Sequence, residues 1–132
     1  MAAVQALYQW DLTEQSPDDI ESNFICEHDL ADTDLEYFRR VIRQVPRHRH
    51  ELDDTFAPHL GRELGGVDPV ERAILRMAAY ELRFEPEIPF RVVIDEAIEL
   101  AKTFGAEHSY RFINGVLDKV AAELRPTEPR PD

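Results

Sequence analysis

The chain has 132 residues, 43% of them hydrophobic, and a formal net charge of -12 at pH 7. This length is typical of one domain and supplies enough apolar residues for a core, which excludes a chain that is disordered throughout. The single cysteine, Cys26, excludes an internal disulfide and a cysteine-based zinc site, and its apolar neighbours predict a small buried thiol.

The negative charge is unevenly distributed. Residues 1–38 contain ten acidic residues and no Lys or Arg, which leaves 17 acidic and 15 basic residues in the remainder. Because phosphate binding depends on Lys and Arg, the total charge by itself argues against nucleic acid. The nearly neutral charge of residues 39–132 does not argue against nucleic acid binding.

Apolar residues three or four positions apart predict a helix over residues 4–12. Ser16-Pro17-Asp18-Asp19 then predicts a turn in which an aspartate caps a second helix, over residues 20–25. Asp32-Thr33-Asp34 is expected to cap a third helix with apolar positions from Leu35 to Val45, which Pro46 should end or bend.

A short helical segment is expected over residues 52–60, followed by the flexible pair Gly65-Gly66. The clearest start signal lies at residues 68–71, where Asp68 can cap a helix and Glu71 can complete a capping box. Apolar residues continue to Leu82, so we expect this helix to be central and largely buried.

Prolines in the segment 84–89 predict a loop. Two further helices follow, over residues 92–101 and from about residues 107–109 to Val120. The proline-rich tail 125–132 is expected to be disordered. No strand pattern competes, and the sequence therefore predicts an all-α bundle in one domain.

No motif supports catalysis or metal binding. The sequence has no Gly-x-Ser-x-Gly, no glycine-rich phosphate loop and no Glu-x-x-His pair, and His48 and His50 cannot share a helical face. No apolar run approaches the roughly 18 residues of a membrane span, and the N-terminus lacks a basic signal region. We expect a cytoplasmic protein that is not an enzyme and needs no cofactor or metal.

Two segments could contact RNA. Arg39, Arg43 and Arg47 are spaced four apart and would form a cationic stripe, unless neighbouring acids such as Asp34, Glu36 and Glu51 neutralise it. The last helix offers aromatic, amide and cationic groups of the kinds that hold single-stranded RNA: His108, Tyr110, Arg111, Phe112, Asn114 and Lys119. It also fits an ordinary helix with Phe112 in the core.

Three stretches, which cover nearly the whole chain in order, form a recognisable pattern: Ala6-Leu7-Tyr8-Gln9-Trp10; residues 70–76 with Tyr80-Glu81-Leu82; and residues 95–102 through Phe104-Gly105 to residues 112–118. Together they resemble the NusB family of bacterial transcription antitermination factors. The resemblance implies about seven helices in two packed helical subdomains, over residues 1–124, without a cofactor.

The resemblance also implies partners. Members of the family pair with NusE, a small-subunit ribosomal protein, and the pair binds the boxA element of ribosomal RNA leaders, with other Nus factors and RNA polymerase as indirect partners. Some relatives form homodimers. By motif, RNA would be contacted by Tyr8, His108, Arg111, Phe112 and Asn114, and NusE by Glu71, Arg76 and Glu81.

The sequence departs from the family pattern at two points. Members usually carry an arginine-rich arm before Ala6-Leu7-Tyr8, and this arm is either lost here or lies upstream of Met1, so we expect weak unaided RNA binding. His108 stands where an acid is common, which should favour RNA binding.

Two alternatives remain open: an interaction domain that binds NusE and has lost RNA contact, and a fragment related to the NusB-like domain of ribosomal RNA cytosine methyltransferases.

Overall fold

The computed structural model describes residues 2–13, 15–27 and 34–128. Within these ranges the chain forms seven α-helices and two short 3-10 helices and contains no strand, which confirms the all-α prediction. The elements are α1 (Ala2–Leu12), α2 (Pro17–Glu27), α3 (Leu35–Arg47), α4 (Arg49–Phe56), η1 (Ala57–His59), η2 (Leu64–Gly66), α5 (Pro69–Phe84), α6 (Phe90–Phe104) and α7 (Ser109–Leu124).

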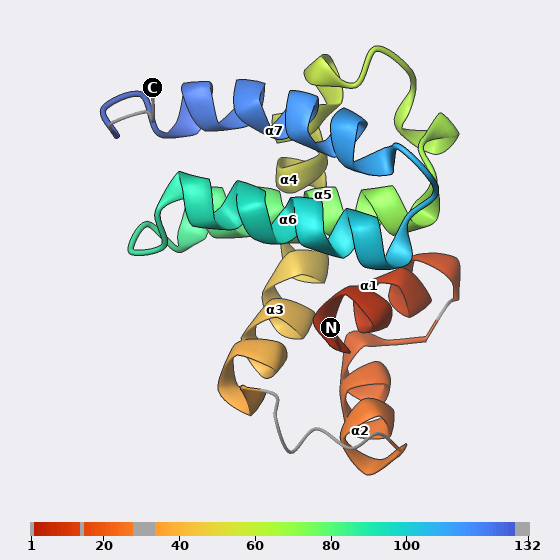
Figure 1. Ribbon diagram of the computed structural model, residues 1–132. Coiled ribbons are helices and arrows are strands. Elements are labelled where there is room, and N and C mark those ends of the chain that lie inside the picture. The colour runs from red at the N-terminus through yellow and green to blue at the C-terminus, as the bar shows by residue number, and fades with distance from the viewer. Residues whose placement is uncertain (1, 14, 28–33, 129–132) are drawn as a thin grey trace.

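The helices form two packed groups, as the sequence resemblance implied (Figure 1). Helices α1, α2 and α3 contact one another at one end of the molecule, and α4 to α7 form the other group. Helix α5 joins the two groups because it packs against α1 and α3 as well as against α4, α6 and α7.

Helix α5 is central, as predicted. Every residue from Ala73 to Leu82 is buried. Asp68 caps the helix by accepting hydrogen bonds from the backbone N–H groups of Val70, at 2.8 Å, and Glu71, at 3.4 Å. The predicted capping box is wrong in its second half: the Glu71 carboxylate accepts a hydrogen bond from the Ser109 hydroxyl at 2.7 Å instead.

The other predicted helix ends differ in detail. Asp34 caps α3 by accepting from Tyr37 N at 3.1 Å, and α3 ends one residue after Pro46, as expected. The remaining cap candidates of that helix, residues 32–33, lie outside the described residues. The prediction that an aspartate caps α2 was wrong. The cap is the hydroxyl of Ser16, which accepts a hydrogen bond from the backbone N–H of Asp19 at 3.2 Å.

Two apolar positions are exposed against expectation. Cys26 is exposed, because it lies on the side of α2 opposite the buried Phe24. Val92, expected to support the apolar face of its helix, is 46% exposed in the first turn of α6. The prediction of burial was wrong at both positions. It relied on apolar neighbours in the sequence, whereas burial depends on the side of the helix on which a residue lies.

The segment that follows α7 is anchored to the bundle by its first residue, Arg125. Arg125 donates hydrogen bonds to the carbonyl oxygens of Leu82 and Ile88, both at 2.9 Å. Residues 129–132 of the predicted tail lie outside the described residues. Among the helices that the structure describes, none is long and apolar enough to cross a membrane.

Candidate nucleic-acid interface

The turn between α6 and α7 is tightly constrained. His108, immediately before α7, has a φ of 68° and is the one non-glycine residue with positive φ among those described. Gly105 has an ordinary φ, but a Cβ there would lie 2.7 Å from the carbonyl oxygen of Ala101 and 2.9 Å from Oγ of Ser109. Close packing therefore requires glycine at this position.

This turn brings two cations to one aromatic ring. Lys102 Nζ lies 5.2 Å from the centroid of the Tyr110 ring, and the guanidinium carbon of Arg111 lies 5.7 Å from it. The adjacent cleft of about 410 Å³ is lined by Lys102, Gly105, Ala106, Glu107, His108 and Tyr110. The turn therefore supplies an aromatic ring and cations, the kinds of group that hold a nucleotide base and its phosphate.

Tyr8, from the other end of the sequence, lies beside the C-terminal end of α6. Its side chain is 37% exposed and lines a second cleft, of about 270 Å³, with Val4, Gln5, Val70 and Phe104. Phe104 directly precedes Gly105, which lines the cleft beside Tyr110. Figure 1 shows the reason: α1 lies next to the C-terminal end of α6.

The remaining predicted RNA contacts lie along α7. Arg111 is exposed, and Asn114 is half-buried. Phe112 packs against the core at the edge of the helix, and the guanidinium carbon of Arg62 lies 4.5 Å from its ring centroid. Phe112 thus has the core contact expected of an ordinary helix and a cation above it.

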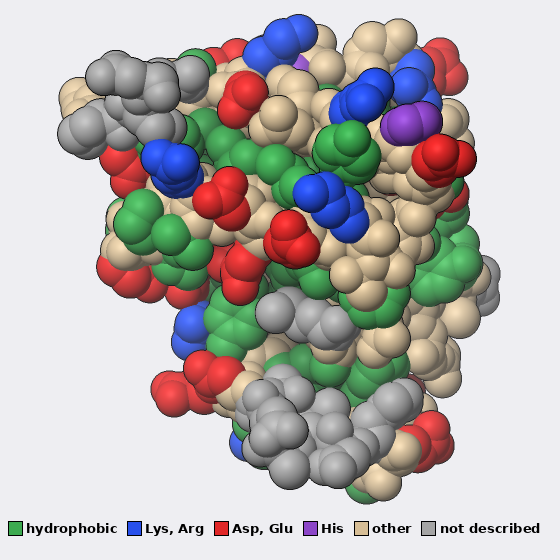
Figure 2. Space-filling view, in the orientation of Figure 1, with side chains coloured by type: hydrophobic (Ala, Val, Ile, Leu, Met, Phe, Trp, Pro, Cys, Tyr) green, Lys and Arg blue, Asp and Glu red, His purple; other side chains and the backbone are tan. Residues whose placement is uncertain are grey.

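Basic side chains gather on this part of the surface. In Figure 2 several Lys and Arg side chains and a histidine lie over the N-terminal end of α7, with acidic side chains at their edge, and most of the charged side chains over α6 are acidic. Sequence reasoning did not assign Arg62 and Lys102 to this surface, because each lies beside its aromatic partner only after folding. In the sequence, each of these residues is a single cation next to a predicted turn, which does not indicate an aromatic partner.

The arginine stripe of α3 is partly neutralised by acids from other helices. Arg43 makes two hydrogen bonds to Glu21, at 2.9 and 3.0 Å, and Arg40 makes two to Glu85, at 3.0 and 3.1 Å. Glu51, one of the acids expected to neutralise the stripe, pairs with Arg83 at 2.8 Å. Of the three stripe arginines, Arg43 is thus engaged by Glu21 of α2. Arg40, which is not part of the stripe, pairs with Glu85 just after the end of α5.

The three predicted NusE contacts occupy different environments on α5. Glu71 is half-buried near the start of the helix, beside Ser109. Arg76 is 2% exposed and Glu81 is 3% exposed. Because steps of five residues rotate around a helix, these side chains do not form one outward face.

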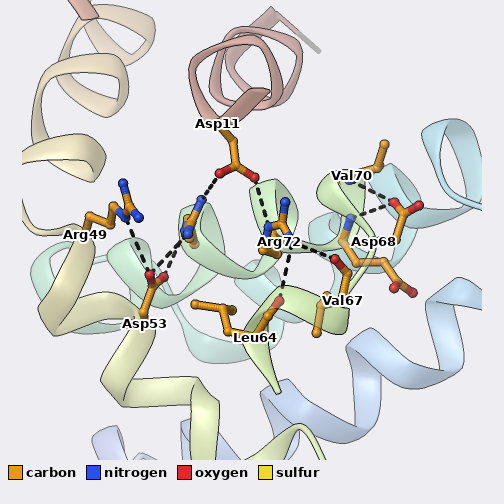
Figure 3. Close-up of polar contacts among 10 residues, drawn as sticks. Asp11, Arg49, Asp53, Leu64, Val67, Asp68, Val70 and Arg72 are labelled. Carbon is orange, nitrogen blue, oxygen red and sulfur yellow. Dashed lines mark hydrogen bonds and ion pairs between the residues drawn. The ribbon is translucent and has the colours of Figure 1, made fainter. Parts of the chain in front are cut away.

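Arg76 belongs to a buried ion-pair network that joins both helical groups (Figure 3). Its guanidinium donates to Asp53 of α4 at 2.8 and 3.1 Å and forms an ion pair with Asp11 of α1 at 3.1 Å. Arg72 donates to Asp11 at 2.9 Å and to the carbonyl oxygen of Val67 at 2.8 Å. Burial raises the pKa of Asp11, but its contacts with the two arginines outweigh burial and lower that pKa overall.

Glu81 faces a second buried cluster, between α3, α5 and α6. Burial, together with the charges of Glu96 and Glu85, raises the pKa of its carboxyl to about 7, although the Tyr37 hydroxyl and Arg40 oppose the shift. The Tyr80 hydroxyl donates to Glu85 at 2.8 Å in the same cluster. Within the described ranges no group of three or more His, Cys, Asp or Glu could hold a metal ion.

Comparison with known proteins gives one consistent family. The NusB family model matches residues 1–122. Transcription antitermination protein NusB of Pasteurella multocida is 53% identical over 122 residues, covering 92% of this chain and 85% of that protein. The protein of the same name from Nitrosococcus oceani is 54% identical over 127 residues, covering 96% of this chain and 85% of that protein.

The fold agrees with a solved structure. NusB of T. maritima superposes with a TM-score of 0.81 at 38% identity, covering 92% of this chain and 87% of that one. The names of these relatives are those of transcription factors and not of enzymes, in agreement with the expectation from the sequence.

Proposed function

The chain belongs to the NusB family, and on that premise we propose that it is a transcription antitermination factor that pairs with NusE and binds boxA RNA of ribosomal RNA leader transcripts. Other Nus factors and RNA polymerase are then indirect partners, and the protein acts in the cytoplasm without a cofactor.

One observation carries the RNA-binding part of the proposal. Tyr8 of α1 lines a cleft with Phe104 at the C-terminal end of α6. The turn that follows Phe104 lines a second cleft with Tyr110 and Lys102. Single-stranded RNA is held by stacking on aromatic rings and by cations on its phosphates. We assign RNA contacts to Tyr8, His108, Arg111, Phe112 and Asn114 and add Lys102 and Tyr110.

Glu71 is the direct NusE contact in this proposal. Its carboxylate is half-buried at the start of α5 and can meet a basic partner, which suits a ribosomal protein. The buried Arg76 and Glu81 act indirectly, because they fix α5 against α1, α3 and α4.

The substitution His108→Asp tests the RNA surface. His108 lines the cleft beside Tyr110, and its side chain is 61% exposed. A new negative charge there should weaken boxA binding by the NusE-bound protein roughly fivefold, since a nearby like charge at a surface costs about 1 kcal/mol. A filter-binding titration measures the effect. His50→Asp, at an exposed position of α4, is the matched control, and equal losses in the two variants would refute the assigned surface.

The substitution Glu71→Lys tests the partner surface. Reversing this charge should abolish capture of the protein by immobilised NusE, because two cations would meet at the interface. Glu99→Lys makes the same change at an exposed position of α6 and should leave capture intact. Unchanged capture of the Glu71 variant would count against the interface at α5.

A further inference from the structure

The hydrogen bond between Glu71 and Ser109 links the two proposed binding surfaces. Oγ of Ser109 donates to Oε2 of Glu71 at 2.7 Å, across the starts of α7 and α5. Ser109 is 5% exposed, whereas Glu71 is partly exposed, so the contact has one end in the bundle and one end at the surface.

The same hydroxyl lies at the centre of the turn that carries the RNA contacts. Ser109 directly follows His108 and its strained φ of 68°. Its backbone N–H donates to the carbonyl oxygen of Ala106 at 3.0 Å, and its Oγ occupies the space that a side chain at Gly105 would need. A residue held in the left-handed region costs about 1–2 kcal/mol and persists only where its surroundings fix it.

We propose that Glu71 and Ser109 form a latch through which a basic partner docked on α5 positions the RNA-binding turn. This inference rests on the proposed function and adds to it the contact through which the two ligands act on each other, with Ser109 as a positioning residue. RNA binding and partner binding then reinforce each other, since coupling between two sites is reciprocal.

The chemistry of the carboxylate allows both contacts at once. An ionised carboxylate accepts about four hydrogen bonds, so a partner cation can pair with Oε1 while Ser109 keeps Oε2. Docking removes water from Glu71 and strengthens its remaining hydrogen bond, because a charge-assisted bond gains in a drier environment. A firmer bond to Ser109 holds His108 and Tyr110 in the conformation that lines the cleft.

The test is a binding cycle with NusE and labelled boxA RNA as the probes. The ratio of the RNA dissociation constants without and with saturating NusE gives the coupling for each variant. Ser109→Ala should lower this ratio about tenfold, the effect of losing one hydrogen bond to a charged group. Its affinity for NusE in the absence of RNA should stay within about twofold of the unsubstituted protein, because the variant keeps Glu71.

Two further variants separate the possible outcomes. Ser22→Ala, at an exposed position of α2, should leave the coupling unchanged. Glu71→Gln keeps an acceptor for Ser109 but loses the charge, so it should bind NusE weakly and retain its RNA affinity in the absence of NusE. Circular dichroism at the assay temperature establishes that each variant is folded.

The results distinguish failure of the latch from failure of the function. If the unsubstituted protein binds both probes and Ser109→Ala shows the same coupling, the latch is refuted and the function stands. If the unsubstituted protein binds neither NusE nor boxA RNA, the proposed function itself is refuted.

Discussion

Replacing Glu81 by glutamine should change how the stability of the protein depends on pH. The carboxyl of Glu81 is 3% exposed, and burial, with the charges of Glu96 and Glu85, raises its pKa from 4.5 to about 7. Between these two values the folded state holds a proton that the unfolded state has released. The stabilisation from this group is therefore complete below pH 4.5 and is lost as the pH rises through about 7.

The size of the effect follows from the pKa difference. Each pKa unit corresponds to about 1.4 kcal/mol, so ionisation of Glu81 removes at most about 3 kcal/mol from the free energy of unfolding. Glutamine remains neutral and keeps an acceptor for the Tyr37 hydroxyl. The variant should therefore match the unsubstituted protein at pH 4.5 and be more stable by up to about 3 kcal/mol at pH 8.

Urea denaturation at several pH values between 4.5 and 8 measures this difference directly. Subtracting the two proteins cancels the titration of the groups that do not interact with Glu81, provided that unfolding is two-state. Glu87→Gln, in the exposed loop before α6, is the control and should show a small difference at every pH. A difference between the Glu81 variant and the unsubstituted protein that does not change with pH would refute the reasoning.

Three other substitutions test the account. Asp53→Ala leaves the buried Arg76 network with one acid and should lower the free energy of unfolding by about 3 kcal/mol, whereas the exposed Asp54→Ala should change it little; urea denaturation compares the two. Asp68→Ala removes the cap of α5 and should cost about 1 kcal/mol in the same assay, and no change would contradict the observed cap. Lys102→Ala should reduce the salt-dependence slope of boxA binding by about 0.7, and Arg91→Ala, at the far end of α6, should not; equal slopes would remove Lys102 from the RNA surface.

Local signals predicted the helices well because they depend on neighbours in the sequence. Asp68 and Pro69 start α5, Pro46 lies in the last turn of α3, and both effects act within one helical turn. Burial of single residues was less predictable, since Cys26 has apolar neighbours in sequence yet lies on the outer side of α2.

Long-range contacts could not be predicted from periodicity. The acid that pairs with Arg43 comes from α2, and the hydroxyl that binds Glu71 comes from α7, so neither pairing leaves a pattern in the sequence. The sequence pattern at Glu71 predicted a capping box, but its carboxylate accepts a hydrogen bond from the distant Ser109 instead. The family resemblance predicted RNA contacts at both Tyr8 and His108. The fold places Tyr8 beside Phe104 at the end of α6, a proximity that periodicity does not predict.

The central claim is that this chain binds boxA RNA together with NusE. A titration of labelled boxA RNA with the protein, with and without NusE and at two salt concentrations, tests it most directly. We expect tight binding with NusE, much weaker binding without it, and a loss of affinity at the higher salt concentration. Absence of RNA binding in both cases, or equal binding of a scrambled RNA, would contradict the account.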